Sequence, residues 1–184
     1  MIKFTATFKS YGQDSRISIH WQIIKQQEDN GIIERVQNDD IVASPGRVHY
    51  LPHHPVVKEE RETSKVRVVY DASSNSPSLN ECLEKGPCLI PLILDILVRF
   101  RAYNVGLVSD IKQAYLNVEV NEEHRNFLRF LWIEDINDPN SQKIVYRFTR
   151  VIFGMTSSQF LLTAVIMKHL SKYREDSIFV NQFM

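Results

Sequence analysis

The sequence has little of several features that mark common protein classes. It contains only two cysteines, Cys82 and Cys88, and this number predicts ordinary thiols in a reducing compartment and not a disulfide framework. Its most apolar stretch, residues 89–98, is interrupted by Asp95 and is too short to cross a bilayer. The N-terminal MIKFTATFKS lacks the apolar core of a secretory signal. We therefore expect an intracellular, cytoplasmic protein with no membrane partner.

The sequence also lacks an excess of charge of either sign. It has 22 basic and 22 acidic residues, so the whole chain creates no field that would gather nucleic acid, and such binding would need a local patch. The six glycines are scattered and form no phosphate-binding loop. Nothing marks a serine or a cysteine as an activated nucleophile. With 184 residues, 43% of them hydrophobic, the chain can still build one core.

Hydrophobic patterns predict helices and strands that are mixed without a regular βαβ rhythm. Helical periodicity predicts helices in HWQIIKQQEDNG, ended by Gly31, in IPLILDILVRFRAY, with Pro91 in the first turn, and in TSSQFLLTAVIMKHL, which Thr156, Ser157 or Ser158 can cap. Extended or strand structure is predicted for VHYLPHHPVV, KVRVVYDAS, FLRFLWI and IVYRFTRV, and a turn-rich loop for SSNSPSLN. The sequence therefore indicates an α+β fold.

One aspartate follows directly on an apolar run. Residues 105–108 have the pattern of a buried strand, Asp110 comes after them, and Tyr115 follows five residues later. A carboxylate at the end of a buried strand is a natural hard ligand for Mg²⁺. The flat ring of Tyr115 is able to pack against one face of a sugar. The alternative is that Asp110 caps the turn DIKQAY. These six residues alone do not decide between the two interpretations.

Two other groups of residues have a packing interpretation. An apolar set recurs at helical spacing, and we expect it in the core: Leu92, Ile93, Ile96, Leu97 and Phe100. Three histidines lie close together in HYLPHH, namely His49, His53 and His54. No cysteine pair or HExxH helix accompanies them, so surface and packing roles are favoured over a zinc site.

Three longer segments together resemble a known family. They are VHYLPHHPVVKEERETSKVRVVYDASSNSPSLNECLEKGPCLIPLILDILVRFR, DIKQAYLNVEVNEEHRNFLRFLW and TRVIFGMTSSQFLLTAVI. In this order and at these separations they resemble the reverse transcriptase of Pao-type (BEL/Pao) retrotransposons, from about Gly31 to the C-terminus. The resemblance implies a right-hand polymerase, with the N-terminal helix and fingers in residues 1–90 and part of the palm in residues 91–184.

The resemblance implies roles for individual residues of the palm. Asp110 matches the catalytic aspartate, and its carboxylate together with the Ile111 carbonyl would bind Mg²⁺. Tyr115 matches the aromatic steric gate, which excludes a ribose 2′-hydroxyl and so favours deoxynucleotides. Phe153 and Gly154 match the segment that packs against the nascent base pair.

The resemblance also implies a phosphate-binding role in the fingers. Lys65 and Arg67 match the basic residues that hold the incoming triphosphate, and a guanidinium fork suits phosphate oxygens. The alternative is that both are solvated residues on the polar face of a strand. Gln159 stands where the family usually has a proline.

The reaction that the resemblance implies is template-directed transfer of a dNTP to a primer 3′-hydroxyl, with two metal ions and an RNA or DNA primer–template. In the family, a Tyr-X-Asp-Asp hairpin follows a segment like SIFVNQFM, where this sequence ends. We therefore expect a fragment without that hairpin, the rest of the palm, the thumb and RNase H, inactive alone. Asp39–Asp40 lies in a fingers-side loop and cannot replace the hairpin.

Two other functions stay open at this point. The chain can be a domesticated module that uses the fingers surface to bind nucleic acid or a protein, although its balanced charge argues mildly against non-specific nucleic-acid binding. It can also be a structural or interaction protein without a nucleic-acid role.

Overall fold

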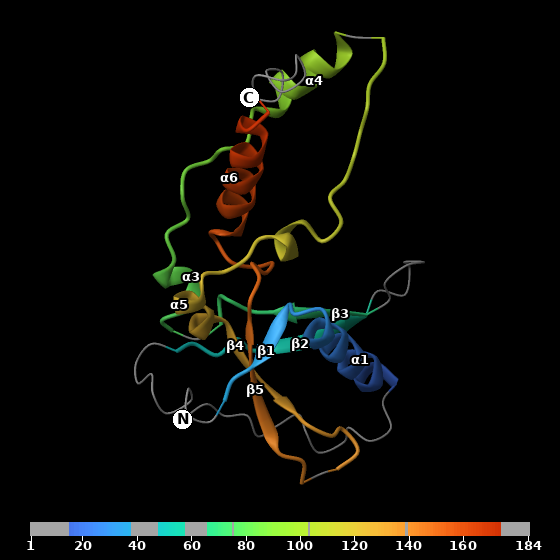
Figure 1. The fold of residues 1–184 in the computed structure, drawn as a ribbon, viewed down its shortest axis with the longest axis vertical. Coiled ribbons are helices and arrows are strands. Elements are labelled where there is room, and N and C mark those ends of the chain that lie inside the picture. The colour runs from blue at the N-terminus through green and yellow to red at the C-terminus, as the bar shows by residue number, and fades with distance from the viewer. Residues whose placement is uncertain are drawn as a thin grey trace.

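The computed structural model describes residues 15–37, 48–57, 66–74, 76–102, 104–138 and 140–173. Helices and antiparallel strands are mixed, which confirms the predicted α+β class (Figure 1). In chain order the elements are α1 (Ser15–Asp29), β1 (Ile33–Arg35), β2 (His53–Val57), β3 (Val66–Tyr70), α3 (Leu79–Cys82), α4 (Ile93–Arg101), η2 (Ala114–Asn117), α5 (Glu122–Arg125), η3 (Asn126–Leu128), β4 (Arg129–Ile133), β5 (Lys143–Phe148) and α6 (Ser158–Ser171).

Two antiparallel sheets form the lower part of the molecule in Figure 1. One sheet has the order β1-β5-β4, in which β4 and β5 form a hairpin and Ile33 of β1 pairs with Phe148 of β5. The other is the hairpin of β2 and β3, with His53 opposite Tyr70. The extended and strand segments predicted from alternation and aromatic content are confirmed in β2, β3, β4 and β5. The three-residue strand β1 was not predicted.

Helix α1 ends where the sequence predicts. Gly31 has a φ of +64°, a left-handed conformation that favours glycine. The Ile32 N–H donates to the Gln27 carbonyl at 2.9 Å and the Gly31 N–H donates to the Glu28 carbonyl at 2.9 Å, as in a helix that closes on a left-handed residue. This turn directs the chain from α1 into β1.

Aromatic side chains from both sheets fill the core. The ring of Phe130 stacks on Tyr146 with the centroids 5.6 Å apart, and it lies 5.4 Å from Phe148. Tyr70, at the end of β3, meets Phe148 edge to face at 4.7 Å. Such aromatic pairs contribute beyond their buried area. Tyr70 therefore joins the two-stranded sheet to the three-stranded sheet.

His53, for which packing was predicted, takes part in this core, and so does His20, for which no role was predicted. His20 of α1 is only 4% exposed, and its ring lies 5.3 Å from His53 and 4.5 Å from Trp132. The Nε2 of His53 donates to the Leu131 carbonyl at 3.0 Å. Burial, with the charges of His53 and His54, lowers the pKa of His20 from 6.5 to about 3. Burial lowers the pKa of His53 as well.

These histidines predict that acid weakens the fold. The unfolded chain takes up a proton at His20 near pH 6.5, whereas the folded chain does so only near pH 3. The contribution of neutral His20 is therefore complete above pH 6.5 and is lost as the pH falls below it, with a slope of up to about 1.4 kcal/mol per pH unit. We expect His20→Gln to flatten the dependence between pH 7.5 and 5, measured by urea unfolding. The exposed His124 supplies a matched control, His124→Gln, which should keep the slope of the parent. An unchanged slope in His20→Gln would contradict the assignment.

Helix α4 forms as predicted, but its predicted burial was wrong. It begins at Ile93, so Pro91 precedes the first turn and does not lie within it. The five residues expected in the core are between 47% and 74% exposed: Leu92, Ile93, Ile96, Leu97 and Phe100. Figure 1 shows α4 at the far end of the molecule from the two sheets. Helical spacing correctly identifies an apolar face, but it does not reveal whether another element packs against that face.

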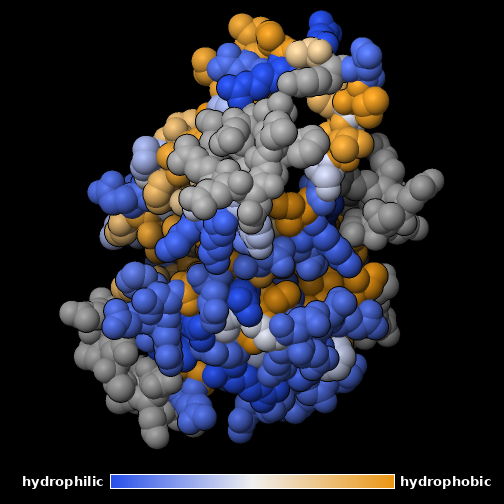
Figure 2. Space-filling view, turned by 45° about the horizontal axis from the view of Figure 1, so that its top comes forward, coloured by the Kyte–Doolittle hydropathy of each residue, from blue (hydrophilic) through white to orange (hydrophobic). Residues whose placement is uncertain are grey.

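The predicted buried strand before Asp110 was wrong for the same reason. Residues 104–111 are extended but form no strand, and Val105, Leu107 and Val108 are 75% to 89% exposed. No backbone hydrogen bond joins them to another residue within the described ranges. The segment approaches α4 at Gly106, where a side chain would overlap the ring of Phe100. Figure 2 shows apolar side chains gathered at this end of the molecule.

This apolar end predicts that copies of the chain associate. Unpaired extended segments with apolar side chains template intermolecular pairing, and burial of a Leu side chain contributes about 1.5–3 kcal/mol. We expect the parent to form oligomers at micromolar concentrations in multi-angle light scattering, and Leu107→Lys to shift the equilibrium toward monomer by about tenfold or more. Gln142→Lys, at an exposed residue before β5, adds the same charge and should leave the association unchanged. A monomeric parent at high concentration would contradict the prediction.

Helix α6 confirms the third predicted helix but not its cap. Ser157 occupies the N-cap position without a capping hydrogen bond from its side chain, and the Ser158 hydroxyl donates to the Ile152 carbonyl at 2.6 Å instead. None of the helices in the described ranges is long and apolar enough to cross a membrane.

Candidate functional site

Tyr115 owes its position to a tight turn after the extended segment. Gln113 has a φ of +54°, unusual for a residue other than glycine, and it turns the chain into η2. The Asn117 side-chain amide donates to the Lys112 carbonyl at 3.0 Å and to the Gln113 carbonyl at 3.2 Å. This turn displays Tyr115 on a single 3₁₀ turn.

A short backbone ladder joins η2 to the segment that carries Phe153. The Val120 N–H donates to the Thr149 carbonyl at 2.8 Å, and the Val151 N–H donates to the Val118 carbonyl at 2.9 Å. The Arg125 guanidinium strengthens the ladder, because it donates to the Val120 carbonyl at 3.1 Å and to Glu119 at 2.9 Å. The ladder places the chain after η2 beside the chain after β5.

Tyr115 and Phe153 consequently come into contact. Their rings meet edge to face with the centroids 4.5 Å apart and the planes at 88°. The Tyr115 hydroxyl donates to the Oε1 of Gln159 at 2.8 Å. Phe153 is 66% exposed, so one side of its ring stays open to a ligand. The structure thus brings together two of the residues predicted to contact a nucleotide, and it adds Gln159 to them.

Asn80 holds the loop of Phe153 and Gly154 against the end of β3. Its side-chain amide donates to the Gly154 carbonyl and to the Ser73 hydroxyl, both at 2.8 Å, and its Oδ1 accepts from the Thr156 N–H at 2.9 Å. Asn80 belongs to α3, a short helix that begins with a capping box of Ser78 and Glu81. The expected turn-rich loop thus ends in a helix. The Ser-x-x-Glu pattern is a sequence signal for this helix start.

Gly154 fits this loop because it has no side chain. Its φ is +92°, and a Cβ would lie 3.3 Å from the carbonyl oxygen of Tyr70. Any larger residue would strain the backbone and press on β3. The predicted site residue Gly154 therefore has a clear structural reason to be glycine.

Asp110 and Ile111 lie apart from this arrangement. Both are exposed on the extended segment, and no hydrogen bond or ion pair engages the Asp110 carboxylate within the described ranges. Asp110 does not cap η2, because Gln113 occupies that N-cap position. A carboxylate and a backbone carbonyl are oxygen donors of the kind that Mg²⁺ prefers. However, no group of three or more His, Cys, Asp or Glu side chains able to hold a metal occurs in the part of the chain that the structure describes.

The predicted phosphate-binding residues are only partly placed. Arg67 lies on β3 opposite Val56, with its side chain exposed. No hydrogen bond, ion pair or ring contact joins it to the other described site residues. Lys65 lies outside the described residues, as do Asp39–Asp40 and the segment SIFVNQFM. Both the phosphate-binding and the solvated interpretation of Arg67 are compatible with this position.

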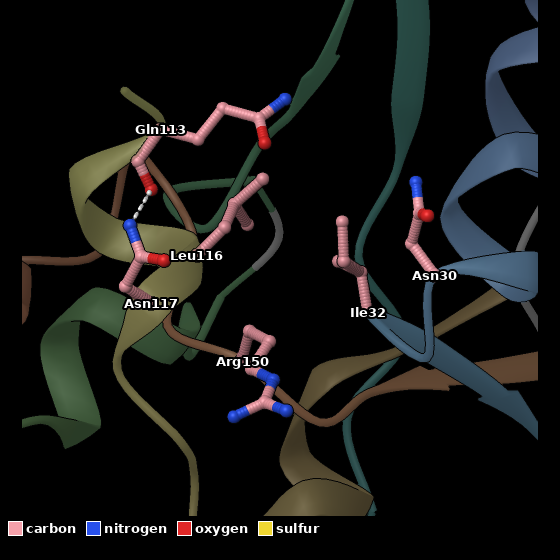
Figure 3. Close-up of a pocket in the computed structure, with 6 residues that line it drawn as sticks. All are labelled: Asn30, Ile32, Gln113, Leu116, Asn117 and Arg150. Atoms are coloured by element: carbon pink, nitrogen blue, oxygen red, sulfur yellow. Dashed lines mark hydrogen bonds between the residues drawn. The ribbon is translucent and has the colours of Figure 1, made fainter. Parts of the chain in front are cut away.

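A pocket of about 390 Å³ lies between η2 and the turn after α1 (Figure 3). Leu116 and Ile32 face each other across it, and the remaining lining is polar: Asn30, Gln113, Asn117 and Arg150. The Arg150 guanidinium lies 3.8 Å from Glu119. The pocket does not include Asp110, Tyr115 or Phe153, so it is separate from the predicted nucleotide site.

The comparisons with known proteins add no family to this geometry. The chain matches no protein-family model and no curated protein. The roles of Asp110, Tyr115 and Phe153 therefore stay predictions from the resemblance. The structural observations relevant to them are the contacts of Tyr115, Phe153, Gln159 and Asn80 described above.

The contacts of Asn80 predict that it stabilises the site loop. We expect Asn80→Ala to lower the free energy of unfolding by about 1–3 kcal/mol, because it removes two donors and one acceptor in a partly buried position. Asn80→Asp is the matched variant, since it keeps the acceptor for Thr156 and loses only the donors. It should retain the hydrogen-exchange protection of the Thr156 amide, whereas Asn80→Ala should lose it. Protection of the Thr156 amide in Asn80→Ala equal to that in the parent would show that Asn80 does not hold the loop.

Proposed function

We propose that this chain forms the fingers and the first part of the palm of a reverse transcriptase, an RNA-directed DNA polymerase of the Pao retrotransposon type. Its proposed ligand is a deoxynucleoside triphosphate. The observation that supports the proposal is the contact of Tyr115 with Phe153, whose ring centroids lie 4.5 Å apart. The resemblance assigns both residues to the nucleotide site, and they come from segments that are distant in the sequence.

The aromatic pair suits a nucleotide in shape and polarity. The two rings stand at 88° to each other and Phe153 is 66% exposed, so its ring remains accessible for a sugar or a base pair to pack on. Tyr115 supplies the wall that a ribose 2′-hydroxyl would meet. Phe153, at the tip of a loop fixed by Asn80, supplies a second wall.

The charged residues have complementary roles in the proposal. Arg67, and with it Lys65, holds the triphosphate through its phosphate oxygens. The Asp110 carboxylate and the Ile111 carbonyl would hold Mg²⁺, which stabilises the charge that moves between the attacking and the leaving oxygen. Arg67 is exposed on β3 and therefore accessible to a phosphate.

The small number of carboxylates available for metal binding limits the chemistry that the isolated chain can perform. Two divalent ions about 4 Å apart repel by roughly 17 kcal/mol at an effective dielectric constant of 20. One carboxylate, Asp110, offsets little of this repulsion, and the described residues add no cluster of acids beside it. The proposal is therefore tested by measuring nucleotide binding to the 184-residue chain, and not by measuring primer extension.

We expect dATP with Mg²⁺ to shift the amide resonances of Phe153 and Gly154 in two-dimensional NMR. Arg67→Ala should weaken this binding by about tenfold or more, because a hydrogen bond to a charged group contributes about 1.5–3 kcal/mol. Lys143→Ala removes the same charge at an exposed residue of β5 outside the ladder and should not change the affinity.

Two outcomes would contradict the proposal. One is the absence of shifts at Phe153 and Gly154 up to millimolar dATP. The other is binding that Arg67→Ala and Lys143→Ala weaken equally. Titration with a primer–template at two salt concentrations tests the binding-module alternative, since affinity that falls steeply with salt indicates a surface that neutralises phosphates.

A further inference from the structure

Gln159 interacts with the one polar atom of the aromatic pair. Its Oε1 accepts the hydroxyl proton of Tyr115 at 2.8 Å. The sequence places a glutamine here where the resembling family usually has a proline, and a proline side chain offers no acceptor. The contact is therefore a property of this chain's own sequence.

The amide of Gln159 is itself held in one orientation. Its Nε2 donates to the hydroxyl of Thr163 at 3.3 Å, one turn along α6. The Thr163 hydroxyl uses its own proton on the Gln159 backbone carbonyl at 2.9 Å, so toward the Gln159 side chain it acts as an acceptor. An amide whose NH₂ group faces Thr163 presents its oxygen to Tyr115. Each hydrogen bond in the series from Thr163 to Tyr115 thus pairs one donor with one acceptor.

The ring of Tyr115 is consequently fixed at two points. Phe153 contacts its ring edge to face, and Gln159 holds its hydroxyl. A partly exposed ring without such contacts changes rotamer in picoseconds to nanoseconds. A steric gate excludes a 2′-hydroxyl only if the ring is held in place. A ring that moves aside leaves room for the extra oxygen atom.

We propose that Gln159 is a positioning residue that locks Tyr115 through its hydroxyl and so sets how strongly the site prefers a 2′-deoxyribose over a ribose. This inference rests on the proposed function, and it adds a residue that determines specificity. Gln159 does not touch the sugar; it acts through Tyr115. Thr163 supports it by orienting the amide.

The test compares dATP with ATP, which differ only in the 2′-hydroxyl, in NMR titrations of the 184-residue chain. We expect Gln159→Leu to reduce the ratio of the two affinities by about two- to tenfold, the range of one hydrogen bond. Gln159→Glu keeps an acceptor and should retain the ratio of the parent. Tyr115→Phe should reproduce the effect of Gln159→Leu, and the double variant should show no further loss. Gln142→Leu, at an exposed glutamine before β5, serves as the control.

A second readout needs no nucleotide. With 3-fluorotyrosine incorporated, the ¹⁹F resonance of Tyr115 should move toward that of a solvent-averaged ring in Gln159→Leu and stay in place in Gln159→Glu. An unchanged resonance in Gln159→Leu would overturn the lock. An unchanged dATP-to-ATP ratio in that variant, with a parent that discriminates, would overturn the specificity role while the proposed function stands. If the parent binds neither nucleotide, the proposed function fails, and the role in sugar selection fails with it.

Discussion

The backbone ladder between residues 118–120 and 149–151 is the connection on which the candidate site depends. Its hydrogen bonds, 2.8 and 2.9 Å long, join a segment that follows η2 to a segment that follows β5. Together with the bond from Tyr115 to Gln159, it keeps Tyr115 and Phe153 side by side. The same region is tied to the end of α1, because the Thr149 hydroxyl donates to the Gly31 carbonyl at 2.6 Å. The site is therefore assembled on the edge of the aromatic core and not on a mobile loop alone.

A second connection fixes the other side of the site. Tyr70 packs in the core through its ring and presents its carbonyl to Gly154, while Asn80 binds the same loop from α3. The loop of Phe153 thus contacts both the end of β3 and the start of α6. β3 also carries Arg67, so the strand of the predicted phosphate-binding residue ends against the loop of Phe153.

The sequence predicts the elements well where a pattern is a local property. Helix α1, with its end at Gly31, and the strands β3, β4 and β5 follow from periodicity and turn chemistry, because each element's own residues determine them. Burial of α4 and of residues 105–108 was predicted wrongly, because burial depends on a neighbour that periodicity does not name. The short helix α3 had a signal in its capping box. At the site, Tyr115 and Phe153 were named through the resemblance, whereas the contacts of Asn80 and Gln159 depend on tertiary geometry that spacing does not encode.

The extended segment before η2 has a thermodynamic consequence for Asp110. Its backbone makes no hydrogen bond to another residue within the described ranges. The segment that carries the carboxylate lies against the Phe100 ring at Gly106 and continues into the turn at Gln113. Any neighbour that paired with this segment would order Asp110 at the same time. The free energy needed to order residues 104–111 would then be part of the free energy with which that neighbour binds.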